Sequence, residues 1–273
     1  EEQPDPEVWE EVRSEQHVCT QKGCARNPRC FYQALRRRVQ AADLVVLNHA
    51  LFFTLVRSQG EAEGHLEGIL FAKDFVILDE AHTMEDVASR HIGMEISQLG
   101  LRRSLQRLYN PRSKKGLFQA MKNGPACSAV ADLIPKSDAF FNRIAARCAF
   151  KRGRVFRVRE ASLADSSELS TGLARLAELL KIEAGKHKED DRASELLEAA
   201  SHLRETRLSI EDFLQLEQPD HVYWVEQYGR REALCALHAA PVHLAEILRR
   251  MLFREETCAM LTSATLSVGG SDL

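Results

Sequence analysis

The sequence predicts an α/β protein that combines part of a parallel sheet with a large, mainly helical insert. Two unbroken apolar runs, Phe75–Leu78 and Cys258–Leu261, are typical of strands buried on both faces of a parallel sheet. Between them lie about 130 residues of mostly amphipathic helical pattern, a length that suits an inserted domain. We therefore expect the two runs to be strands of one sheet, interrupted by the helical segment.

Composition bounds the possible classes of protein. At 273 residues, with 44% apolar and 28% charged residues, the chain is globular and long enough for one large domain or two ordinary ones. A net charge of −3 gives no global sign of nucleic-acid binding, so any such surface must be local. No apolar run reaches the length of a membrane span, and the acidic start is no signal peptide. Because the chain starts without Met and ends soon after an apolar run, we expect it to be part of a longer protein.

Three of the seven cysteines lie together near the start of the chain. Cys19, Cys24 and Cys30 follow a Cys-x4-Cys-x5-Cys pattern, which suits an intracellular cofactor site better than a secreted disulfide scaffold. This spacing is looser than the usual zinc knuckle, so an iron–sulfur cluster is favoured and zinc stays an alternative. A cluster needs four ligands, and we expect the fourth upstream of residue 1. We predict the remaining cysteines to be small buried residues, namely Cys127, Cys148, Cys235 and Cys258.

A basic helix is predicted directly after these cysteines. Apolar residues recur at helical spacing over residues 31–42, with Arg36, Arg37 and Arg38 between them. The arginines form either a solvated helix face or, with neighbouring basic residues of the cysteine loop, a surface for a phosphate backbone. Both interpretations stay open. Residues 43–47 are predicted as a further buried strand, and a helix is predicted over residues 50–57.

The long segment after His82 is predicted to be helical. A helix over residues 83–90 is followed by amphipathic patterns over residues 95–220 with no convincing buried strand. Two leucine-rich stripes predict an antiparallel pair of helices packed through these residues: Leu169, Leu173, Leu176 and Leu180 in one, and Leu196, Ala200, Leu203, Ile210 and Leu214 in the other. Core packing explains both stripes without a cofactor.

Strand-like patterns occur at three further places. The basic run 151–159 alternates with apolar residues and predicts either an exposed strand or one that faces nucleic acid, although a solvated face is favoured for any single arginine in it. Within this run, Arg152 and Arg154 are the DNA-binding candidates. Residues 221–226 and 233–238 are predicted as strands, after which Pro241 is expected to open a helix over residues 242–253.

Polar residues follow both principal apolar runs. Asp79 and Glu80 stand at the carboxyl end of the first, where open α/β sheets bind their ligands. Two solvated acids at a strand end would be the simpler interpretation of the dipeptide alone. The second run ends in the hydroxyl-rich stretch Thr262–Thr265. The sequence therefore indicates metal and nucleotide chemistry at this edge of the sheet.

Three features stand in a fixed order: the cysteine cluster, Asp79-Glu-Ala-His82, and Ser263-Ala-Thr265. Their order and spacing resemble the iron–sulfur DNA helicases of the DinG/XPD family in helicase superfamily two, with a cysteine spacing similar to that of the bacterial DinG-like branch. The phrases at residues 42–51, 237–242 and 261–266 support the resemblance.

The resemblance implies a fold and its domain boundaries. The fold would be a partial RecA-like parallel sheet, which is the first motor domain of a P-loop NTPase, with a cysteine-cluster insert and a helical arch-like insert. The implied domains are an iron–sulfur region at 1–38, the first part of the motor at 39–94, the arch-like insert at 95–235 and the second part of the motor at 236–273.

The same resemblance implies roles for individual residues. Asp79 would hold the Mg²⁺ of ATP, and Glu80 would orient and deprotonate the attacking water. His82 would connect the nucleotide site with the Ser-Ala-Thr motif, whose Ser263 and Thr265 would link hydrolysis to movement on DNA. Three of the four ligands of a 4Fe-4S cluster would be Cys19, Cys24 and Cys30.

The implied activity is ATP-dependent unwinding of DNA. We expect a monomeric motor of bacterial cytoplasm and nucleoid, acting 5′ to 3′ on single-stranded and forked duplex DNA in repair or replication, and no membrane partner. The chain contains no Gly-x4-Gly-Lys-[Ser/Thr] loop, so we expect it not to hydrolyse ATP by itself. Two alternatives stay open: a translocase or nuclease-associated relative that does not unwind, and a metal- or cluster-containing nucleic-acid-binding module with a degenerate motor.

Overall fold

The computed structural model describes residues 29–60, 75–150, 153–161, 163–187, 191–229, 234–253 and 258–264. They belong to two compact units, each of which is described by itself. The first unit contains residues up to 41 together with 99–140 and 164–211, and the second contains 42–98, 141–163 and 212 onward. Among the described residues, no helix is long and apolar enough to cross a membrane.

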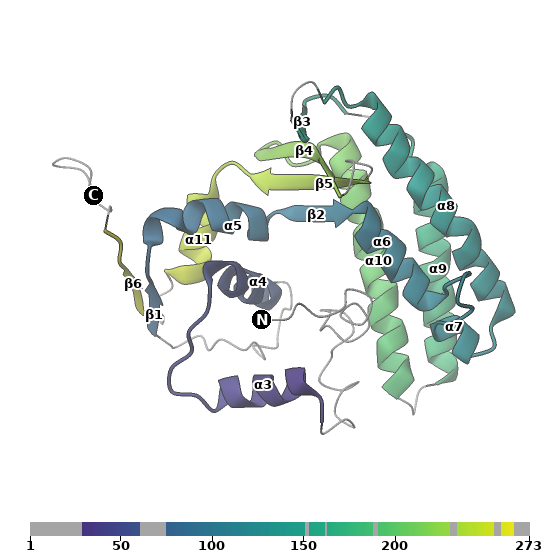
Figure 1. Ribbon diagram of the computed structural model, residues 1–273, viewed down its shortest axis with the longest axis horizontal. Coiled ribbons are helices and arrows are strands. Elements are labelled where there is room, and N and C mark those ends of the chain that lie inside the picture. Colours follow the sequence, from purple (N-terminus) through teal and green to yellow (C-terminus); the bar gives the residue numbers. More distant parts are fainter. Residues whose placement is uncertain are drawn as a thin grey trace. The chain divides into compact units, whose positions relative to one another are not determined.

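The first unit is helical (Figure 1). Its elements are α3 (Phe31–Gln40), α6 (Gln98–Leu108), α7 (Leu117–Ala120), most of α8 (Gly124–Arg147), α9 (Ser167–Lys186) and most of α10 (Asp191–Gln215). Every residue of the two predicted leucine-rich stripes is buried, on α9 and α10 respectively. Ser170, near the start of α9, donates a hydrogen bond of 2.5 Å to Glu211, near the end of α10, so the predicted antiparallel pair is confirmed.

Close contacts fix the neighbouring helices of this unit. A Cβ atom at Gly172 of α9 would lie 2.3 Å from Cδ1 of Leu133 on α8, so a larger residue there would require the Leu133 side chain to move. The buried carboxylate of Glu183 accepts hydrogen bonds from Lys186 at 2.8 Å and from Asn123 at 3.2 Å. These bonds, that of Lys186 first, hold the pKa of Glu183 below its ordinary value.

The described residues of the second unit form two sheets with helices beside them. Its parallel sheet consists of β1 (Phe75–Leu78) and β6 (Cys258–Leu261), paired from Phe75 with Cys258 to Leu78 with Leu261. The prediction that the two apolar runs are strands of one sheet is therefore confirmed. Helices α4 (His49–Gly60), α5 (Met84–Ile92) and α11 (Leu244–Leu252) belong to the same unit, and the short 3-10 helix η1 (Ala81–Thr83) joins β1 to α5.

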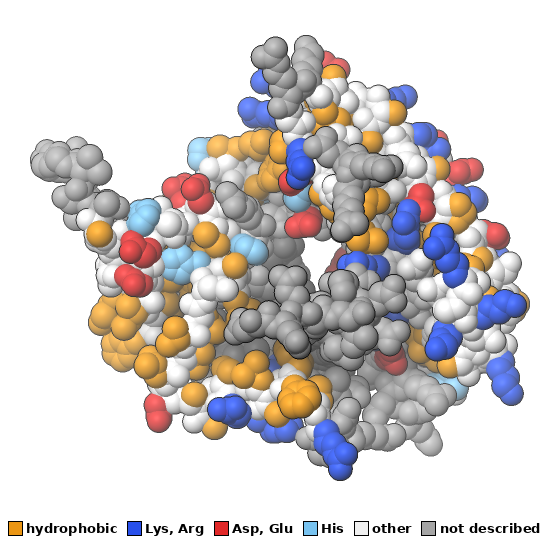
Figure 2. All heavy atoms as spheres, viewed as in Figure 1, with side chains coloured by type: hydrophobic (Ala, Val, Ile, Leu, Met, Phe, Trp, Pro, Cys, Tyr) orange, Lys and Arg blue, Asp and Glu red, His pale blue; other side chains and the backbone are white. Residues whose placement is uncertain are grey.

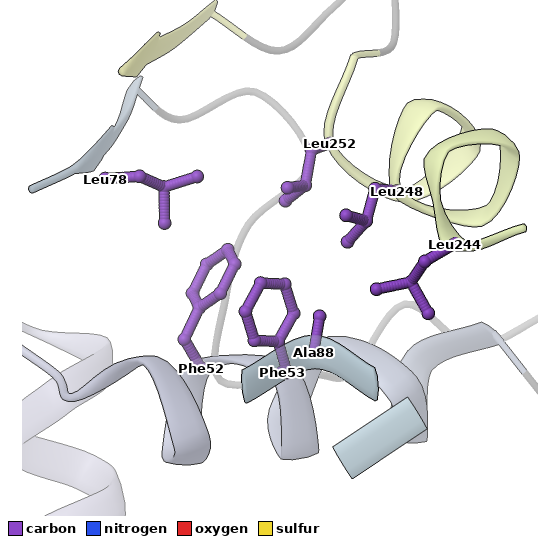
Figure 3. Packing of buried hydrophobic residues seen from close by; sticks show 7 residues of the cluster. All are labelled: Phe52, Phe53, Leu78, Ala88, Leu244, Leu248 and Leu252. Atoms are coloured by element: carbon purple, nitrogen blue, oxygen red, sulfur yellow. The ribbon is translucent and has the colours of Figure 1, made fainter. Parts of the chain in front are cut away.

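The core beside the parallel sheet forms on one of its faces. Leu78 points towards Phe52 and Phe53 of α4, and the leucines of α11 complete the cluster (Figure 3). Its buried members are Phe52, Phe53, Leu78, Ala88, Leu244, Leu248 and Leu252. Burying these side chains stabilises the packing of α4 and α11 against β1 by roughly 1.5–3 kcal/mol for each large residue.

The prediction that β1 and β6 are buried on both faces is wrong for the described residues. Phe75 and Ile77 are 73% and 62% exposed, and their neighbour Met260 is 46% exposed. Figure 2 shows hydrophobic side chains exposed together over this part of the molecule. The reason is that residues i and i+2 of a strand share a face, and in the described part of the chain only the face of Val76 and Leu78 packs against helices.

The predicted strand over residues 43–47 is also wrong. These residues have no strand assignment, and Leu44 and Val46 are 79% and 87% exposed. A strand exists through its hydrogen bonds to a neighbour, and no described strand pairs with this segment. An apolar run that is β-like in composition therefore forms a connection without regular secondary structure that leads to α4.

The second sheet has four antiparallel strands in the order β2-β5-β4-β3. They are β2 (Met94–Ser97), β3 (Val155–Val158), β4 (His221–Tyr228) and β5 (Leu234–Pro241). The predicted strands at 221–226 and 233–238 are confirmed, whereas β2 was missed because four residues are too short for a clear pattern. β3 confirms the strand interpretation of the basic run. β4 and β5 pair along their whole length, and the predicted domain boundary at residue 235 falls within β5.

Two details complete this sheet. Gly93 alone separates α5 from β2, and a Cβ atom there would lie 2.4 Å from the carbonyl oxygen of Ala239 on β5. Pro241 ends β5 and does not open α11, which begins at Leu244, because its backbone continues the pairing with His221.

Candidate active site

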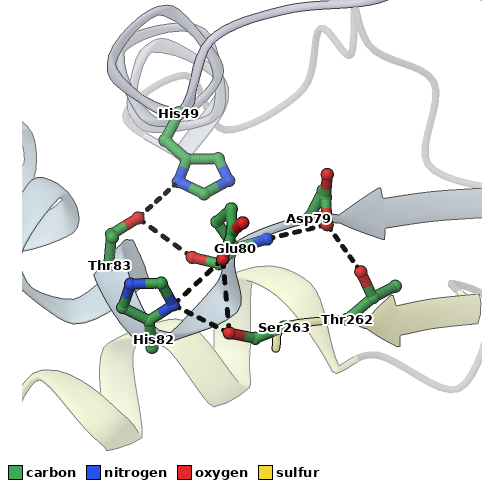
Figure 4. A network of polar contacts seen from close by, with 7 residues as sticks. All are labelled: His49, Asp79, Glu80, His82, Thr83, Thr262 and Ser263. Carbon is green, nitrogen blue, oxygen red and sulfur yellow. Dashed lines mark hydrogen bonds and ion pairs between the residues drawn. The ribbon is translucent and has the colours of Figure 1, made fainter. Parts of the chain in front are cut away.

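The register of the parallel sheet determines which polar residues meet. Since Leu78 pairs with Leu261, the residues that follow, Asp79 and Thr262, leave the sheet side by side. Thr262 donates its backbone N–H to the carbonyl oxygen of Leu78 at 2.9 Å, and Ala81 donates to the carbonyl oxygen of Thr262 at the same distance. The strand ends are thus held together just where their side chains turn polar (Figure 4).

Asp79 is kept in its anionic form. Its Oδ1 accepts a hydrogen bond of 2.6 Å from the hydroxyl of Thr262 and one of 3.0 Å from the backbone N–H of Glu80. These two bonds, the first being the stronger influence, lower the pKa of Asp79 below its ordinary value, and nearby His49 contributes a smaller lowering. Oδ2 takes no part in these contacts, which leaves a charged oxygen for a hard cation.

Glu80 adopts a backbone conformation that is costly for a residue with a side chain. Its φ of 51° and ψ of 44° lie in the left-handed region, at a cost of about 1–2 kcal/mol for a residue other than glycine. Thr83 stabilises this turn, since both its backbone N–H and its hydroxyl donate to the carbonyl oxygen of Glu80 at 3.0 Å. Strain of this kind is typical of residues whose direction matters for function.

Three side chains converge beyond the turn. The Oγ of Ser263 lies 2.7 Å from Nδ1 of His82 and 3.4 Å from Oε2 of Glu80, and that Nδ1 lies 3.3 Å from the same Oε2. A hydrogen on Nδ1 satisfies all three contacts, because the imidazole can donate to Ser263 while Ser263 donates to Glu80. A bare Nδ1 lone pair would instead face the carboxylate. The geometry therefore favours His82 with its proton on Nδ1.

Three polar residues of this network were not predicted: Thr262, Thr83 and His49. The Nδ1 of His49 lies 3.3 Å from the hydroxyl of Thr83. Thr262 was missed because its role depends on the exact register of β1 and β6, although counting from the ends of the two apolar runs would have found it. No local pattern brings His49 to this site, since it lies 34 residues before Thr83 and reaches it through the packing of α4.

Several predicted site residues lie outside the described part of the chain, namely Cys19, Cys24, Arg152 and Thr265. Their placement stays a prediction. Cys30, the remaining cysteine of the predicted cluster, stands partly exposed directly before α3. Within the described ranges, no group of three or more metal-ligating side chains is found.

The other cysteines differ in their surroundings. Cys127, Cys148 and Cys235 are buried as predicted, and burial raises the pKa of Cys148 to about 11 and that of Cys235 to about 12. Such thiols stay protonated and are poor metal ligands. The prediction for Cys258 is wrong, since it lies on the uncovered face of β6 and is exposed.

The described candidate DNA-binding arginines are divided between the two units. Arg37 and Arg38 are exposed on α3 in the helical unit, and Arg36 lies over the ring of Tyr32 at 5.9 Å from its centroid. Arg154 is exposed just before β3 in the other unit. Their contact with DNA stays a prediction.

The site combines an anionic oxygen for a cation with a second carboxylate linked to a serine and a histidine. Such a set can hold a metal through Asp79 and can accept a proton from water at Glu80. These residues come from the carboxyl ends of parallel strands, where α/β sheets bind ligands.

Comparisons with known proteins agree with this chemistry. Residues 12–101 match the DEAD_2 family model. The chain is 25% identical over 272 residues to "ATP-dependent DNA helicase YoaA" of Haemophilus influenzae, which covers 98% of this chain and 39% of that protein. It is 26% identical to the Escherichia coli protein of the same name, with 97% and 39% covered. A third relative, "3'-5' exonuclease DinG" of Bacillus subtilis, is 26% identical, with 88% and 29% covered.

Proposed function

We infer that this chain, a relative of the DinG and YoaA DNA helicases, supplies the metal-holding and water-activating side of an ATPase site in a longer DNA helicase. The chain spans about two fifths of the length of the YoaA proteins it matches. The observation that carries the proposal is the meeting of Asp79 and Glu80 with Thr262 and Ser263 at one end of a parallel sheet.

The chemistry assigned to each residue follows from its contacts. Glu80 accepts the proton of the water that attacks the terminal phosphate of ATP, and its strained backbone fixes where the carboxylate points. Ser263 and His82 hold that carboxylate by hydrogen bonding. Because Ser263 follows β6 while Glu80 follows β1, a change at the nucleotide is passed to the second strand through this bond. Thr265 completes the same motif.

A magnesium ion fits the donor set at Asp79. The carboxylate is exposed, anionic and partly free, and Mg²⁺ accepts a single protein carboxylate with water and phosphate oxygens as its other ligands. When bound, the ion would neutralise charge that develops on the phosphates. This accounts for a site in which the described residues offer one strong ligand rather than a group of three.

An iron–sulfur cluster is proposed for Cys19, Cys24, Cys30 and a fourth ligand outside the chain. The support is chemical: three thiols near one another in sequence, one of them partly exposed before α3, while the three cysteines of the two cores are buried. When bound, the cluster would cross-link the segment of the chain that carries these cysteines. Iron and sulfide analysis of anaerobically purified full-length protein should give four of each per chain, whereas stoichiometric zinc without sulfide would refute the cluster.

The finer functional assignments belong to the same proposal. We propose 5′ to 3′ translocation on single-stranded DNA and unwinding of forked duplexes in DNA repair or replication, by a monomeric motor in the bacterial cytoplasm and nucleoid. Arg36, Arg37, Arg38, Arg152 and Arg154 are the proposed DNA contacts. A fork substrate labelled on either strand tests the polarity, because unwinding only with a 3′ tail would contradict it.

The name of the Bacillus subtilis relative keeps a second function open. That protein is called a 3'-5' exonuclease, so a motor that serves a nuclease without unwinding is the alternative for this chain. The fork assay separates the two, since such a protein would hydrolyse ATP on single-stranded DNA and leave the duplex intact.

The test of the ATPase site is Glu80→Gln in the full-length protein. The amide keeps the size of the side chain but cannot accept a proton, so we expect DNA-stimulated ATP hydrolysis to fall by about 10²–10⁴-fold. Binding of Mg²⁺·ATP should be retained. Glu168, an exposed residue of α9 in the other unit, offers a matched control as Glu168→Gln. Undiminished ATP hydrolysis by the Glu80→Gln variant would refute the assignment of this site to an ATPase motor.

A further inference from the structure

His49 is held in a fixed position beside the strand that carries the acids. It is the first residue of α4, whose start is capped by the side chain of Asn48, which accepts the backbone N–H of Leu51 at 2.8 Å. Phe52 and Phe53 follow on the same helix and pack against Leu78, the residue directly before Asp79. The imidazole is thus tied by the core to the same strand end as the catalytic acids (Figures 3 and 4).

Both side-chain contacts of the Thr83 hydroxyl are hydrogen bonds at the same time in only one arrangement of hydrogens. The hydroxyl of Thr83 donates to the carbonyl oxygen of Glu80 at 3.0 Å, so its lone pairs are what it offers to other groups. Nδ1 of His49, 3.3 Å from that hydroxyl, must then carry a hydrogen and donate it. The result is two linked hydrogen bonds: His49 donates to the hydroxyl of Thr83, and this hydroxyl donates to the backbone carbonyl of Glu80.

The series of hydrogen bonds that begins at His49 ends at Glu80, whose backbone is strained. Glu80 has a φ of 51°, and its carbonyl oxygen is fixed by two bonds from Thr83, one from the backbone and one from the hydroxyl. The orientation of that peptide group and the direction of the Glu80 side chain are set by the same backbone dihedrals. If the hydroxyl turns away, the left-handed conformation loses one of its two bonds and the carboxylate can leave Ser263 and His82.

We propose that His49 is a positioning residue for Glu80: by donating to Thr83 it keeps the hydroxyl on the Glu80 carbonyl and so aims the carboxylate at the attacking water. The inference rests on the proposed function, because it assigns a partner to the same site. It concerns kcat rather than nucleotide binding, since the side-chain contact of His49 is with Thr83 and its charge makes only the smallest contribution to the lowered pKa of Asp79.

The experiment compares three substitutions of His49 in the full-length protein. The amide nitrogen of Asn can take the place of Nδ1, that of Gln takes the place of Nε2, and Phe keeps the ring without a donor. We expect His49→Phe and His49→Gln to lower kcat of DNA-stimulated ATP hydrolysis about tenfold, with KM for ATP changed less than about twofold. His49→Asn should recover most of the kcat lost in His49→Phe.

Substitutions at Thr83 test the same pair of hydrogen bonds at their shared residue. Thr83→Val removes the hydroxyl at constant shape and should lower kcat as much as His49→Phe does. The double variant should lose no more kcat than either single variant, because both substitutions interrupt the same hydrogen bonds. Thr83→Ser, which keeps the hydroxyl, should recover most of the loss. Additive losses in the double variant would overturn the proposal.

The remaining outcomes are also decisive. Thermal unfolding measured on each variant identifies any that fails to fold, and a loss confined to unstable variants would overturn the positioning role. So would an unchanged kcat in His49→Phe, a rise in KM in place of the fall in kcat, or equal losses in His49→Asn and His49→Phe. Glu80→Gln in the same preparation separates the two claims: if it is inactive while His49→Phe is fully active, the ATPase assignment stands and the role of His49 fails.

Discussion

The two sheets of the second unit differ in how much of them is buried. In the antiparallel sheet, Tyr223, Val225 and Leu237 are 3%, 0% and 0% exposed. In the parallel sheet, Phe75 and Ile77 are 73% and 62% exposed, and only Leu78 is fully packed. Yet the parallel sheet carries the candidate site, whereas the antiparallel sheet carries none of the predicted catalytic residues.

The difference shows that a strand can position the residues of a site without being buried on both faces. The antiparallel strands are fixed by long pairing and by buried side chains, which in β5 lie on both faces. The parallel strands need only hold a register of four residue pairs to deliver Asp79 and Glu80 to Thr262 and Ser263. A short, half-covered sheet therefore suffices to assemble a site, while stability comes from elsewhere in the unit.

Truncating one large side chain in each sheet of this chain should break or support this comparison. Leu237→Ala removes a fully buried side chain that lies between Ile96 and Val225 and should lower the free energy of unfolding by about 2–5 kcal/mol. Ile77→Ala removes an exposed side chain and should cost less than about 1 kcal/mol. Urea unfolding followed by circular dichroism measures both. Equal costs would mean that β1 is as buried as β5 in solution.

A smaller effect is expected at the polar end of the parallel sheet. Thr262→Val removes the hydrogen bond that does most to lower the pKa of Asp79, so this pKa should rise towards its ordinary value of 3.8. A carboxyl group with a lowered pKa stabilises the fold above that ordinary value, and this contribution is lost as the pH falls through the lowered pKa. Thr262→Val should therefore lose less stability on acidification below pH 3.8 than the unchanged chain.

The titration of Asp79 by NMR and acid unfolding measure the two parts of this prediction. Thr262→Ser, which retains the hydroxyl, is the matched control and should keep the pKa of Asp79 low. A pKa that does not move in Thr262→Val would show that the backbone N–H of Glu80 alone holds the carboxylate in its anionic form.

The sequence predicted elements well where the pattern was long. The helices α9 and α10, with their buried leucines, and the pairing of the two apolar runs were all foreseen from periodicity and order. The strand at 43–47 and the burial of β1 were not, because an apolar run shows what a residue can bury and not whether a neighbour is present to cover it. The four-residue β2 was too short to be detected.

The candidate site was predictable to the same degree. Asp79, Glu80, His82 and Ser263 were identified from motifs, and the structure brings these four together, although their roles remain proposals. Thr262 needed the register of two strands 183 residues apart, and His49 needed the packing of Phe52 and Phe53 against Leu78. Those relations are tertiary, so no local pattern contains them.

Gly93 fixes the number of residues between the site and the antiparallel sheet. It is the single residue between α5 and β2, and the carbonyl oxygen of Ala239 leaves no room for a side chain there. One inserted residue would shift β2 by one position and exchange its two faces, turning Ile96 out of the core and Glu95 into it. The stretch from Asp79 to Ser97 therefore tolerates substitution on its surface but not a change in length, and variation in length between relatives should fall outside it.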